Sequence, residues 1–432
     1  MGYQLLITPC KNKIISALYD GKRPVQFSVE EQEPQKIRVG GIYVGRVANI
    51  VSNINAAFVE IKPGIMGYLA LGQAAAPITA DTHPDGRIHA GDELVVQVER
   101  EPIKSKLASV TTNINLTGKF AVLIHGKSGV GVSSKITDPA VRARLKELFS
   151  GYAGRQEQGR EPADTLQPRH TVDTGYGCGF IVRTNAAQAG EGELTAELAG
   201  LKRRYEKLLL NGIHRTRFSV LEEPLPAYLC GLRDQYSGQL EEFVTDDPAL
   251  YSQMYAYLSE YQTEDLSKLK LYQEELPLKV LYSLEHRLRE ALQKKVWLKS
   301  GASLVIEPTE ALTVIDVNTG KAVKGREKIE KHFLKINLEA AKEIAYQIRL
   351  RNLSGIILVD FIDMQEDGAV DTLMRTLREY LAEDPVKTTL VDITPLHLVE
   401  ITRKKVRRPL HEEGMVFHGK NECDAPVGTG ED

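Results

Sequence analysis

The stretch Leu312-Thr-Val-Ile-Asp316-Val-Asn318-Thr-Gly320, together with Gly355-Ile-Ile-Leu-Val-Asp360-Phe-Ile-Asp363-Met, decides the fold expected for the C-terminal half of this chain. Each stretch is a short apolar run that predicts a strand buried on both faces and ending in a carboxylate. Between the two stretches, apolar residues recur at helical spacing, and Ser354-Gly355 closes the helix. The residues at these helical positions are Ile329, Phe333, Ile336, Ala340, Ile344 and Ile348.

A strand, a helix and a second strand of this length predict a βαβ unit, in which the two strands lie parallel. Their carboxyl ends then meet at one edge of the sheet, so Asp316 and Asp360 converge. Two converging carboxylates form a hard-oxygen site for Mg²⁺ or Mn²⁺, the ions that phosphoryl chemistry uses. The alternative is that each acid merely ends a strand or caps a helix, but the matched pair favours the metal site.

These residues also carry a resemblance to the catalytic region of the bacterial ribonuclease E/G family. The matching motifs follow in order: Val305-Ile-Glu-Pro-Thr-Glu-Ala-Leu-Thr-Val-Ile-Asp316-Val-Asn318, Asn337-Leu-Glu-Ala-Ala, Gln347-Ile-Arg-Leu-Arg-Asn-Leu and Ile357-Leu-Val-Asp360-Phe-Ile-Asp363-Met. The resemblance extends more thinly from Ile7 to about Arg408. It implies an endoribonuclease of the ribonuclease G type, without the long C-terminal scaffold of the larger members.

Composition is that of an ordinary soluble protein of roughly three domains, with 432 residues, 42% of them apolar and 26% charged. The net charge of −3 gives no overall basic field, so an RNA partner would need local basic patches. Two candidates are residues 201–207 and 403–408, although a charge run is more often a solvated face. The sequence shows no basic leader and no apolar stretch of about 20 residues, which predicts a cytoplasmic protein without a membrane span.

Residues 3–30 predict a hairpin with a turn at Asp20-Gly21, and residues 37–113 predict a five-stranded barrel of the oligonucleotide-binding type. Phe58 and Tyr68 fall on successive strands of this barrel, where aromatic rings stack on bases and Lys106 neutralises the RNA backbone. Spacing alone leaves open that Phe58 belongs to the core. The resemblance favours RNA binding, because the family's binding residues match Phe58, Tyr68 and Lys106.

Residues 179–185 predict a strand that ends in Arg183 and Thr184, and a guanidinium with a hydroxyl suits the oxygens of a phosphate. Alone this is a weak signal. The resemblance implies a pocket that senses the 5′-monophosphate of RNA, at positions that match Gly118, Val122, Arg183 and Thr184.

The resemblance implies a multidomain α+β and α/β fold. Its parts are a ribonuclease-H-like structural subdomain (1–36 with 219–290), the barrel (37–113), the 5′-sensor (114–218), a deoxyribonuclease-I-like catalytic domain (291–410) and a degenerate tail (411–432). The first of these lacks the acidic cluster of an active ribonuclease H and is expected to be structural.

Four scattered cysteines, without a CxxC pair, argue against a disulfide framework and a zinc finger. Family members share one zinc between two chains through a CPxC element, and here Cys423 survives whereas Pro426 replaces the second cysteine. Two protomers would offer two thiolates where structural zinc takes four ligands, unless His411 or His418 completes the set. A zinc-linked dimer is therefore not expected, and a homo-oligomer formed by other contacts stays open.

The sequence thus predicts a metal-dependent endoribonuclease that cuts single-stranded RNA, with products that carry a 5′-phosphate and a 3′-hydroxyl. Its expected role is ribosomal RNA processing or messenger RNA decay. Asp316 and Asp360 are expected to bind the ion, Asn318 to orient a carboxylate or a phosphate oxygen, and Asp363 to point to the other face of the strand. The alternatives are a non-catalytic RNA-binding protein and a metal-dependent deoxyribonuclease. The intact pair of acids argues against the first, and the resemblance argues against the second.

Overall fold

The computed structural model describes residues 2–31, 37–73, 77–81, 83–102, 106–154, 176–234, 240–319, 326–365 and 368–414. The chain divides into two compact units, which are described separately. The first unit comprises residues 1–32, 239–254 and 268–432, and the second comprises residues 33–238 and 255–267.

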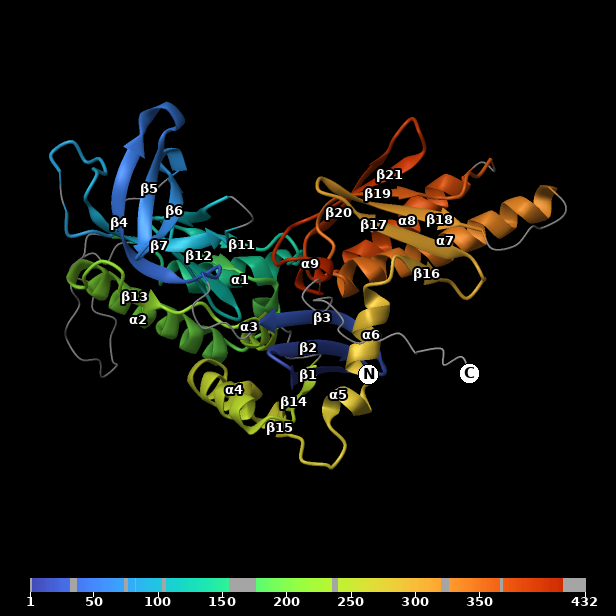
Figure 1. The fold of residues 1–432 in the computed structure, drawn as a ribbon, viewed down its shortest axis with the longest axis horizontal. Coiled ribbons are helices and arrows are strands. Elements are labelled where there is room, and N and C mark those ends of the chain that lie inside the picture. Colours follow the sequence, from blue (N-terminus) through green and yellow to red (C-terminus); the bar gives the residue numbers. More distant parts are fainter. Residues whose placement is uncertain are drawn as a thin grey trace, which may run out of the picture. The chain divides into compact units, whose positions relative to one another are not determined.

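A closed five-stranded barrel forms one half of the second unit, as the sequence predicted (Figure 1). Its strands run in the order β4-β5-β6-β8-β7, and pairing of β4 with β7 closes the barrel. The core is apolar, with Val59, Ile61 and Val96 pointing inward. The bounds are β4 (Ile42–Val51), η1 (Ser52–Ile54), β5 (Ala56–Lys62), β6 (Ile65–Ala70), η2 (Leu71–Gln73), β7 (Glu93–Arg100) and β8 (Ala108–Thr111). A short strand, β13 (Val220–Glu222), pairs with β4 outside the ring.

The rest of the second unit is a four-stranded sheet in the order β11-β12-β10-β9, with helices packed against it. Its strands are β9 (Asn115–Thr117), β10 (Ala121–His125), β11 (Val130–Val132) and β12 (Cys178–Val182). Its helical elements are α1 (Pro139–Ser150), η3 (Thr184–Ala187), α2 (Glu191–His214), α3 (Ala227–Asp234) and η4 (Thr263–Lys268). Asp138 starts α1 by accepting the backbone N–H groups of Ala140 and Val141.

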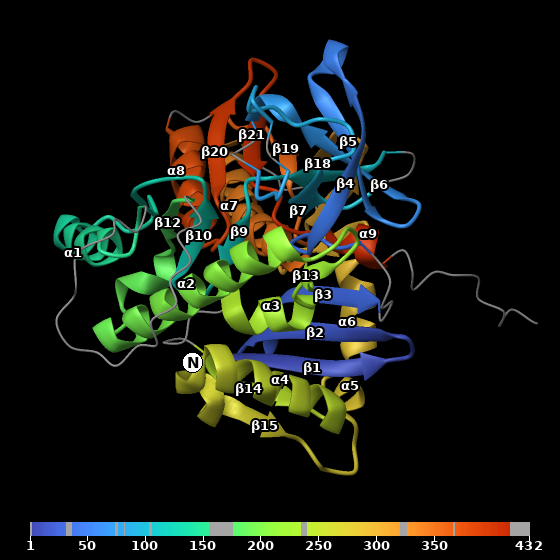
Figure 2. The same ribbon diagram turned by 90° about the vertical axis from the view of Figure 1, so that its left-hand side faces the viewer.

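The first unit begins with a five-stranded sheet in the order β15-β14-β1-β2-β3, which Figure 2 shows from edge to edge. The predicted hairpin at Asp20-Gly21 joins β2 to β3, but the N-terminal segment contains a third strand, β1, which pairs parallel with β14. The strands are β1 (Tyr3–Cys10), β2 (Lys13–Asp20), β3 (Arg23–Glu31), β14 (Leu240–Thr245) and β15 (Leu269–Leu271). Helix α4 (Pro248–Tyr261) begins in this unit and ends in the second, and α5 (Leu278–Leu281) and α6 (Leu284–Ala291) belong to the first.

The second sheet of the first unit contains the predicted βαβ unit. The parallel strands β18 (Leu312–Asn318) and β19 (Gly355–Asp360) are joined through α7 (Arg326–Leu350). The strand order is β16-β17-β18-β19-β21-β20. The remaining elements are β16 (Lys295–Trp297), β17 (Ser303–Pro308), α8 (Ala369–Ala382), β20 (Thr388–Ile393), β21 (Leu398–Arg403) and α9 (Leu410–Gly414).

The expectation that both strands are buried on both faces was wrong. Ile315, Ile357 and Val359 pack against α7 and α8 on one face of the sheet, but Ile356 keeps 49% of its surface exposed. The physical reason is topological: the two helices that connect strands of this sheet, α7 and α8, pack on the same face, whereas short turns without a helix join β17 to β18 and β20 to β21.

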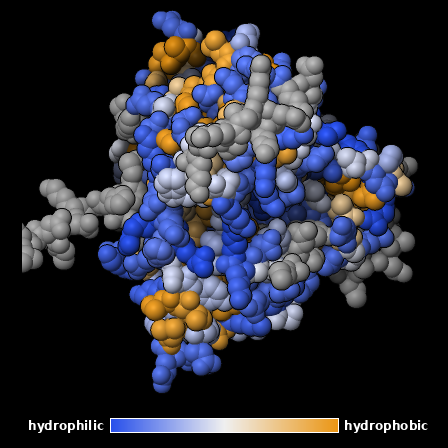
Figure 3. Space-filling model, turned by 90° about the vertical axis from the view of Figure 1, so that its right-hand side faces the viewer, coloured by the Kyte–Doolittle hydropathy of each residue, from blue (hydrophilic) through white to orange (hydrophobic). Residues whose placement is uncertain are grey.

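No helix among the described residues is long and apolar enough to cross a membrane. Figure 3 shows one face of the molecule, which is mostly hydrophilic and carries a few small apolar clusters.

Candidate catalytic and RNA-binding sites

Asp316 and Asp360 are register partners on the parallel strands β18 and β19, and Asp360 is the last residue of its strand. Neighbouring strands lie about 4.8 Å apart, so the two carboxylates stand side by side. Both point to the face opposite Ile315 and Val359, away from α7 and α8. The structure therefore brings together the two acids that the sequence singled out.

Asn318 follows Asp316 on the same face of β18, and its Nδ2 donates a hydrogen bond of 2.6 Å to Asp316 Oδ2. This bond fixes one carboxylate oxygen, and no hydrogen bond from a described residue reaches the other. Asn318 is thus placed to orient Asp316, which is one of the two roles that the sequence predicted for it.

Asp363 does not lie on the strand, contrary to the expectation that it shares β19 with Asp360. β19 ends at Asp360, and the next residues are clamped by Asn337 from α7. The Asn337 Nδ2 donates to the Ile362 carbonyl at 2.8 Å, and the Ile362 N–H donates to Asn337 Oδ1 at 3.1 Å. Asn337 is fully buried and holds the chain just after Asp360, a positioning role that the sequence reasoning missed.

The charges at this edge favour a divalent cation. Partial burial raises the pKa of Asp360, and the negative charges of Asp316 and Asp363 raise it further. A cation bound between the two carboxylates would relieve this repulsion, and oxygen donors of this kind suit Mg²⁺ or Mn²⁺. The donor set fits the implied ion, although within the described ranges no three His, Cys, Asp or Glu side chains are grouped as a metal site.

The aromatic pair of the barrel lies outside the barrel core. Phe58 on β5 and Tyr68 on β6 are register partners, with ring centroids 6.1 Å apart in an edge-to-face arrangement. Both are half-buried, whereas the intervening Val59 points inward. Lys106 is exposed, three residues before Ser109, the register partner of Tyr68 on β8. Phe58 and Tyr68 thus come from adjacent strands, and Lys106 lies just before the strand that pairs with β6 on its other side.

Arg183 follows β12 and is held from two sides. Its Nη1 donates to the Gly118 carbonyl at 2.7 Å, and its Nη2 donates to Asp234 Oδ1 at 2.9 Å. Thr184 is exposed and shares a hydrogen bond of 3.0 Å with Ser133. Val122 is half-buried on the neighbouring strand β10. The structure gathers all four predicted sensor residues in the four-stranded sheet and its adjoining turns.

The turn at Gly118 is fixed by a carboxylate that the sequence reasoning missed. Glu197 on α2 accepts the backbone N–H groups of Lys119, Phe120 and Ala121 at 2.7–2.8 Å. A Cβ at position 118 would lie 2.6 Å from the Glu197 carboxylate, so only glycine fits without a shift. Burial raises the pKa of Glu197 despite these three bonds.

Asp234, which orients Arg183, is the third residue that the sequence did not reveal. Burial by itself would raise its pKa, but the positive charges of Arg233 and Arg183 outweigh that effect and hold it below the usual range. Asp234 therefore stays ionised and orients the Arg183 guanidinium. A carboxylate at the C-terminal end of α3 opposes the helix dipole, so the position itself gave a faint signal that it serves another group.

In each basic run one arginine is engaged within the protein, whereas Arg203, Lys207, Lys404 and Lys405 are exposed. In the second run, Arg403 is 5% exposed and bonds to Asp384 at 2.7 Å and to Asn352 Oδ1 at 2.7 Å, so its role is structural. In the first run, Arg204 is paired with Glu222.

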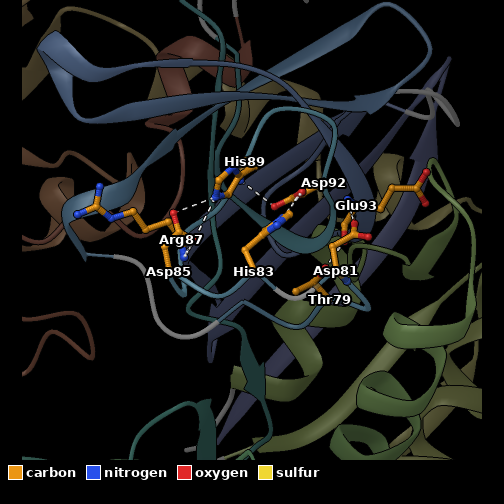
Figure 4. A network of polar contacts seen from close by, with 8 residues as sticks. All are labelled: Thr79, Asp81, His83, Asp85, Arg87, His89, Asp92 and Glu93. Atoms are coloured by element: carbon orange, nitrogen blue, oxygen red, sulfur yellow. Dashed lines mark hydrogen bonds and ion pairs between the residues drawn. The ribbon is translucent and has the colours of Figure 1, made fainter.

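A polar network fixes the barrel loop that precedes β7 (Figure 4). His83 Nε2 bonds to the buried Asp92 at 2.8 Å, and the rings of His83 and His89 lie 4.0 Å apart. His89 Nε2 in turn lies 3.1 Å from both oxygens of Asp85. The hydrogen bond to Asp92 raises the pKa of His83.

The predicted zinc ligands are only partly described. Cys423 and His418 lie outside the described residues, whereas His411 is half-buried on α9 and its Nδ1 has no hydrogen-bond partner within the described chain. Burial raises the pKa of the thiols of Cys10 and Cys178, which makes them poor nucleophiles and metal ligands.

Comparison with known proteins agrees with the geometry. The model of the Ribonuclease E/G family matches residues 115–406. Ribonuclease G of Salmonella typhimurium (strain SL1344) is 34% identical over 98% of this chain and 83% of its own length. Ribonuclease G of Haemophilus influenzae is 33% identical over 96% of this chain and 83% of its own length. Ribonuclease E of Haemophilus influenzae is 28% identical over the whole chain but only 44% of its own length.

The family match covers β18, α7 and β19, and it contains the paired carboxylates as well as Arg183. The ribonuclease G relatives extend the likeness over nearly the whole chain, the barrel included. The resemblance seen in the sequence is therefore confirmed: this chain belongs to the ribonuclease E/G family, and it is similar to ribonuclease G over nearly all of its residues.

Proposed function

We propose that this chain cuts single-stranded RNA internally, with a divalent metal ion held by Asp316 and Asp360. Family membership identifies the chain as an endoribonuclease, a hydrolase of phosphodiester bonds. The observation that carries the finer proposal is the register pairing of Asp316 with Asp360 at the ends of two parallel strands. Carboxylates in that position repel each other unless a cation lies between them. The pKa of Asp360 is raised first by partial burial and then by this repulsion.

The roles of the residues follow from their contacts. Asp316 and Asp360 would hold the ion, and Asn318 keeps one Asp316 oxygen in place. Asn337 fixes the chain after Asp360 and so limits the positions that this carboxylate can take. A bound Mg²⁺ or Mn²⁺ would supply positive charge for the phosphate and lower the pKa of an attacking water. Attack in line with the leaving 3′-oxygen yields a 5′-phosphate and a 3′-hydroxyl.

Substrate choice is assigned to the second unit. Phe58 and Tyr68 offer two ring surfaces on the outside of the barrel, and unpaired bases can stack on them whereas a duplex hides its bases. Lys106 is exposed and would neutralise a backbone phosphate. Arg183, Thr184, Val122 and the Gly118 turn form the proposed site for a 5′-monophosphate, which favours substrates that carry one.

The subdomain assignments belong to the same proposal. Residues 1–36 with 219–290 would form a ribonuclease-H-like structural part, residues 37–113 the binding barrel, residues 114–218 the sensor, and residues 291–410 a deoxyribonuclease-I-like catalytic part. Action in the cytoplasm on ribosomal RNA precursors or messenger RNA, and assembly into a homo-oligomer without a full zinc link, complete it.

Cleavage of a labelled, AU-rich single-stranded oligoribonucleotide tests the proposal. The unmodified chain should cut it with Mg²⁺ and not with a chelator, and Asp316→Asn should lower the rate at least about 100-fold. Asp392→Asn is the matched control, because Asp392 is an exposed acid on β20 of the same sheet.

The same assay separates the alternatives. Binding without cleavage by the unmodified chain would indicate an RNA-binding protein, and faster cleavage of the DNA version of the oligonucleotide would indicate a deoxyribonuclease. Equal cleavage of the annealed duplex would contradict the proposed role of the barrel.

A further inference from the structure

A cavity of about 270 Å³ lies within the first unit, between the end of α6, strand β17 and helix α9. Its walls are largely apolar, with Leu292 and Leu353 among them, but Arg351 and His411 also line it. At its rim, Lys294 and Glu307 are both more than half exposed and form an ion pair with each other. The rim charges thus cancel, and the charge of the interior comes from Arg351.

Arg351 is a buried cation to which no described carboxylate is hydrogen-bonded. Only 6% of its surface is exposed, and its Nε donates to Gln347 Oε1 at 2.6 Å. Its Nη2 is buried, and the described part of the chain offers no hydrogen-bond partner to Nη2 or to Nη1. The nearby Glu343 is already engaged, since it pairs with Arg23 at 2.8 Å and accepts a bond from Gln347. Two donor groups of the guanidinium are therefore left over.

A second buried arginine in the same unit shows what a satisfied guanidinium looks like here. Arg403 is 5% exposed, pairs with Asp384 at 2.7 Å, and donates to Asn352 Oδ1 and to the Leu353 carbonyl. An unpaired buried charge costs several kcal/mol, so a protein interior normally supplies a partner, as Asp384 does for Arg403. Arg403 thus faces the carboxylate of Asp384, whereas Arg351 faces a cavity.

His411 supports the same conclusion from another element. It lines the cavity from α9, and its Nδ1 has no partner among the described residues. Burial lowers the pKa of His411, and the positive charge of Arg351 adds to that effect, so the imidazole is neutral at physiological pH. Burial also lowers the pKa of Arg351 to about 10, which leaves the guanidinium charged. A neutral imidazole can still donate one N–H beside this cation.

The cavity is separate from the paired carboxylates. Leu353 precedes β19, whereas Asp360 is its last residue, and the strand from Gly355 to Asp360 spans roughly 17 Å at 3.3 Å per residue. Ile306, another lining residue, is the register partner of Ile315 and so lies on the face opposite Asp316. An occupant of the cavity would therefore not contact the proposed metal site.

We infer that this cavity binds a small organic oxyanion, whose phosphate or carboxylate group bonds the free Nη atoms of Arg351. A guanidinium fork matches both groups, because each presents two oxygens in one plane. The His411 ring would donate to a further oxygen, and the apolar walls would take a compact apolar or aromatic body. A volume of about 270 Å³ lies just under the range of about 300–1,000 Å³ typical of drug-sized ligands, so the body is small.

Isothermal titration calorimetry of the full chain in Tris chloride tests the inference with four probes. Phenyl phosphate and benzoate combine an anionic group with an aromatic body, inorganic phosphate has the anionic group alone, and benzyl alcohol has the body alone. We expect phenyl phosphate, benzoate or both to bind in a one-to-one ratio, inorganic phosphate to bind at least tenfold more weakly, and benzyl alcohol not to bind measurably. The comparison of phenyl phosphate with benzoate shows which anionic group the cavity prefers.

Substitution of Arg351 supplies the control for place and for folding. Arg351→Met keeps the length of the side chain and removes the charge, so the affinity of the better probe should fall about 10- to 100-fold. Arg351→Lys keeps the positive charge but lacks the planar guanidinium, so its affinity for the probe should lie between those of Arg351→Met and the unmodified chain. Lys342→Met, an exposed cation on the same helix, should leave the affinity unchanged.

Thermal unfolding without any probe adds a readout that does not depend on binding. Arg351→Met removes an unpaired buried charge and should raise the unfolding midpoint. Arg403→Met leaves the buried Asp384 without its ion-pair partner and should lower the unfolding midpoint by several degrees. No binding by any probe, binding of benzyl alcohol as tight as that of benzoate, or unchanged affinity in Arg351→Met would each overturn the inference. A lower midpoint for Arg351→Met would overturn it as well, because Arg351 would then be a structural cation with a hidden partner.

Discussion

Asp234 holds the Arg183 guanidinium by one nitrogen while the Gly118 carbonyl holds it by another, at 2.9 and 2.7 Å. These two bonds fix the plane of the fork, and within the described chain its Nε makes no further bond. An arginine oriented in this way is prepared for a phosphate before the substrate arrives. A test of the proposed 5′-monophosphate site should therefore distinguish the geometry of the Arg183 guanidinium from its positive charge.

Replacement of Arg183 should remove the preference for a 5′-monophosphate. We expect the unmodified chain to cut a 5′-monophosphorylated oligonucleotide about 10- to 100-fold faster than its 5′-hydroxyl twin, the range that a charged hydrogen bond provides. Arg183→Ala should bring the two rates together by slowing only the first substrate, and Arg183→Lys should keep a small part of the gap. Arg204→Ala should change both rates by the same factor, because Arg204 pairs with Glu222 elsewhere in the unit. Equal rates for the unmodified chain would contradict the sensor.

Replacement of Asp360 by asparagine should have opposite effects on activity and on stability. Cleavage should fall at least about 100-fold, because half of the anionic charge for the ion is gone. In a chelator, however, the unfolding midpoint should rise, because the raised pKa of Asp360 shows that its charge is unfavourable in the folded state. The rise in midpoint that Mg²⁺ gives the unmodified chain should be lost. A variant that still gains stability from Mg²⁺ would show that the ion binds elsewhere.

Replacement of Phe58 and Tyr68 by alanine should weaken substrate binding more than the chemical step. Each stacked base is worth about 1–3 kcal/mol, so KM should rise at least about tenfold while kcat changes little. Tyr43→Phe is a control in the barrel, because this residue is buried and offers no ring to the solvent. Circular dichroism should show an intact fold, since both substituted rings lie outside the barrel core. Loss of the folded signal in the double variant would support the core interpretation of Phe58 instead.

The network of the barrel loop should respond to pH through His83. The hydrogen bond to Asp92 raises the pKa of His83, with further contributions from the charges of Asp85 and Asp81. Its contribution to stability is thus fully present below the unfolded value near 6.5 and is lost as the pH rises through the higher folded value. Amide exchange at His89, whose N–H donates to Asp92 at 2.8 Å, should therefore quicken with pH more than the intrinsic rate does. His83→Gln should abolish this excess, and a titration midpoint of the His83 ring at or below 6.5 would contradict the assignment.

The parts of the fold that the sequence revealed are those with strong local signals. The strand ends at Asp316 and Asp360 and the helix between them could be predicted, because periodicity and the handedness of βαβ units determine their arrangement. The exposure of the second face of this sheet could not be predicted. It depends on the antiparallel neighbours β17 and β21, and no short stretch of sequence shows which strands they pair with. Similarly, Leu281, Leu284, Leu288 and Leu292 recur at helical spacing, which predicts one helix. Ser283 adopts a φ of +49° and separates α5 from α6 instead.

The supporting residues of the sites escaped detection for a related reason. Glu197 and Asp234 act on Gly118 and Arg183 across 79 and 51 residues, and nothing in a short window of sequence shows which backbone groups a carboxylate will accept. Asn337 was part of a motif that the sequence analysis quoted, but its hydrogen bonds to Ile362 required the packing of α7 on the sheet. Arg351 had no local signal of burial, because a cation just after the C-terminal end of a helix is favoured by the helix dipole and is usually exposed.

The parallel pairing of β1 with β14 delays the completion of the first sheet during synthesis of the chain. Tyr3 pairs with Leu240, so β1 leaves the ribosome more than 200 residues before its partner exists. At about 5–20 residues per second, that interval lasts roughly 10–50 s, during which one edge of a largely apolar strand has no hydrogen-bond partner. A nascent chain in this condition is open to pairing with other chains. We expect its yield of folded protein to depend on synthesis rate and on holding chaperones more than the stability of the finished molecule would suggest.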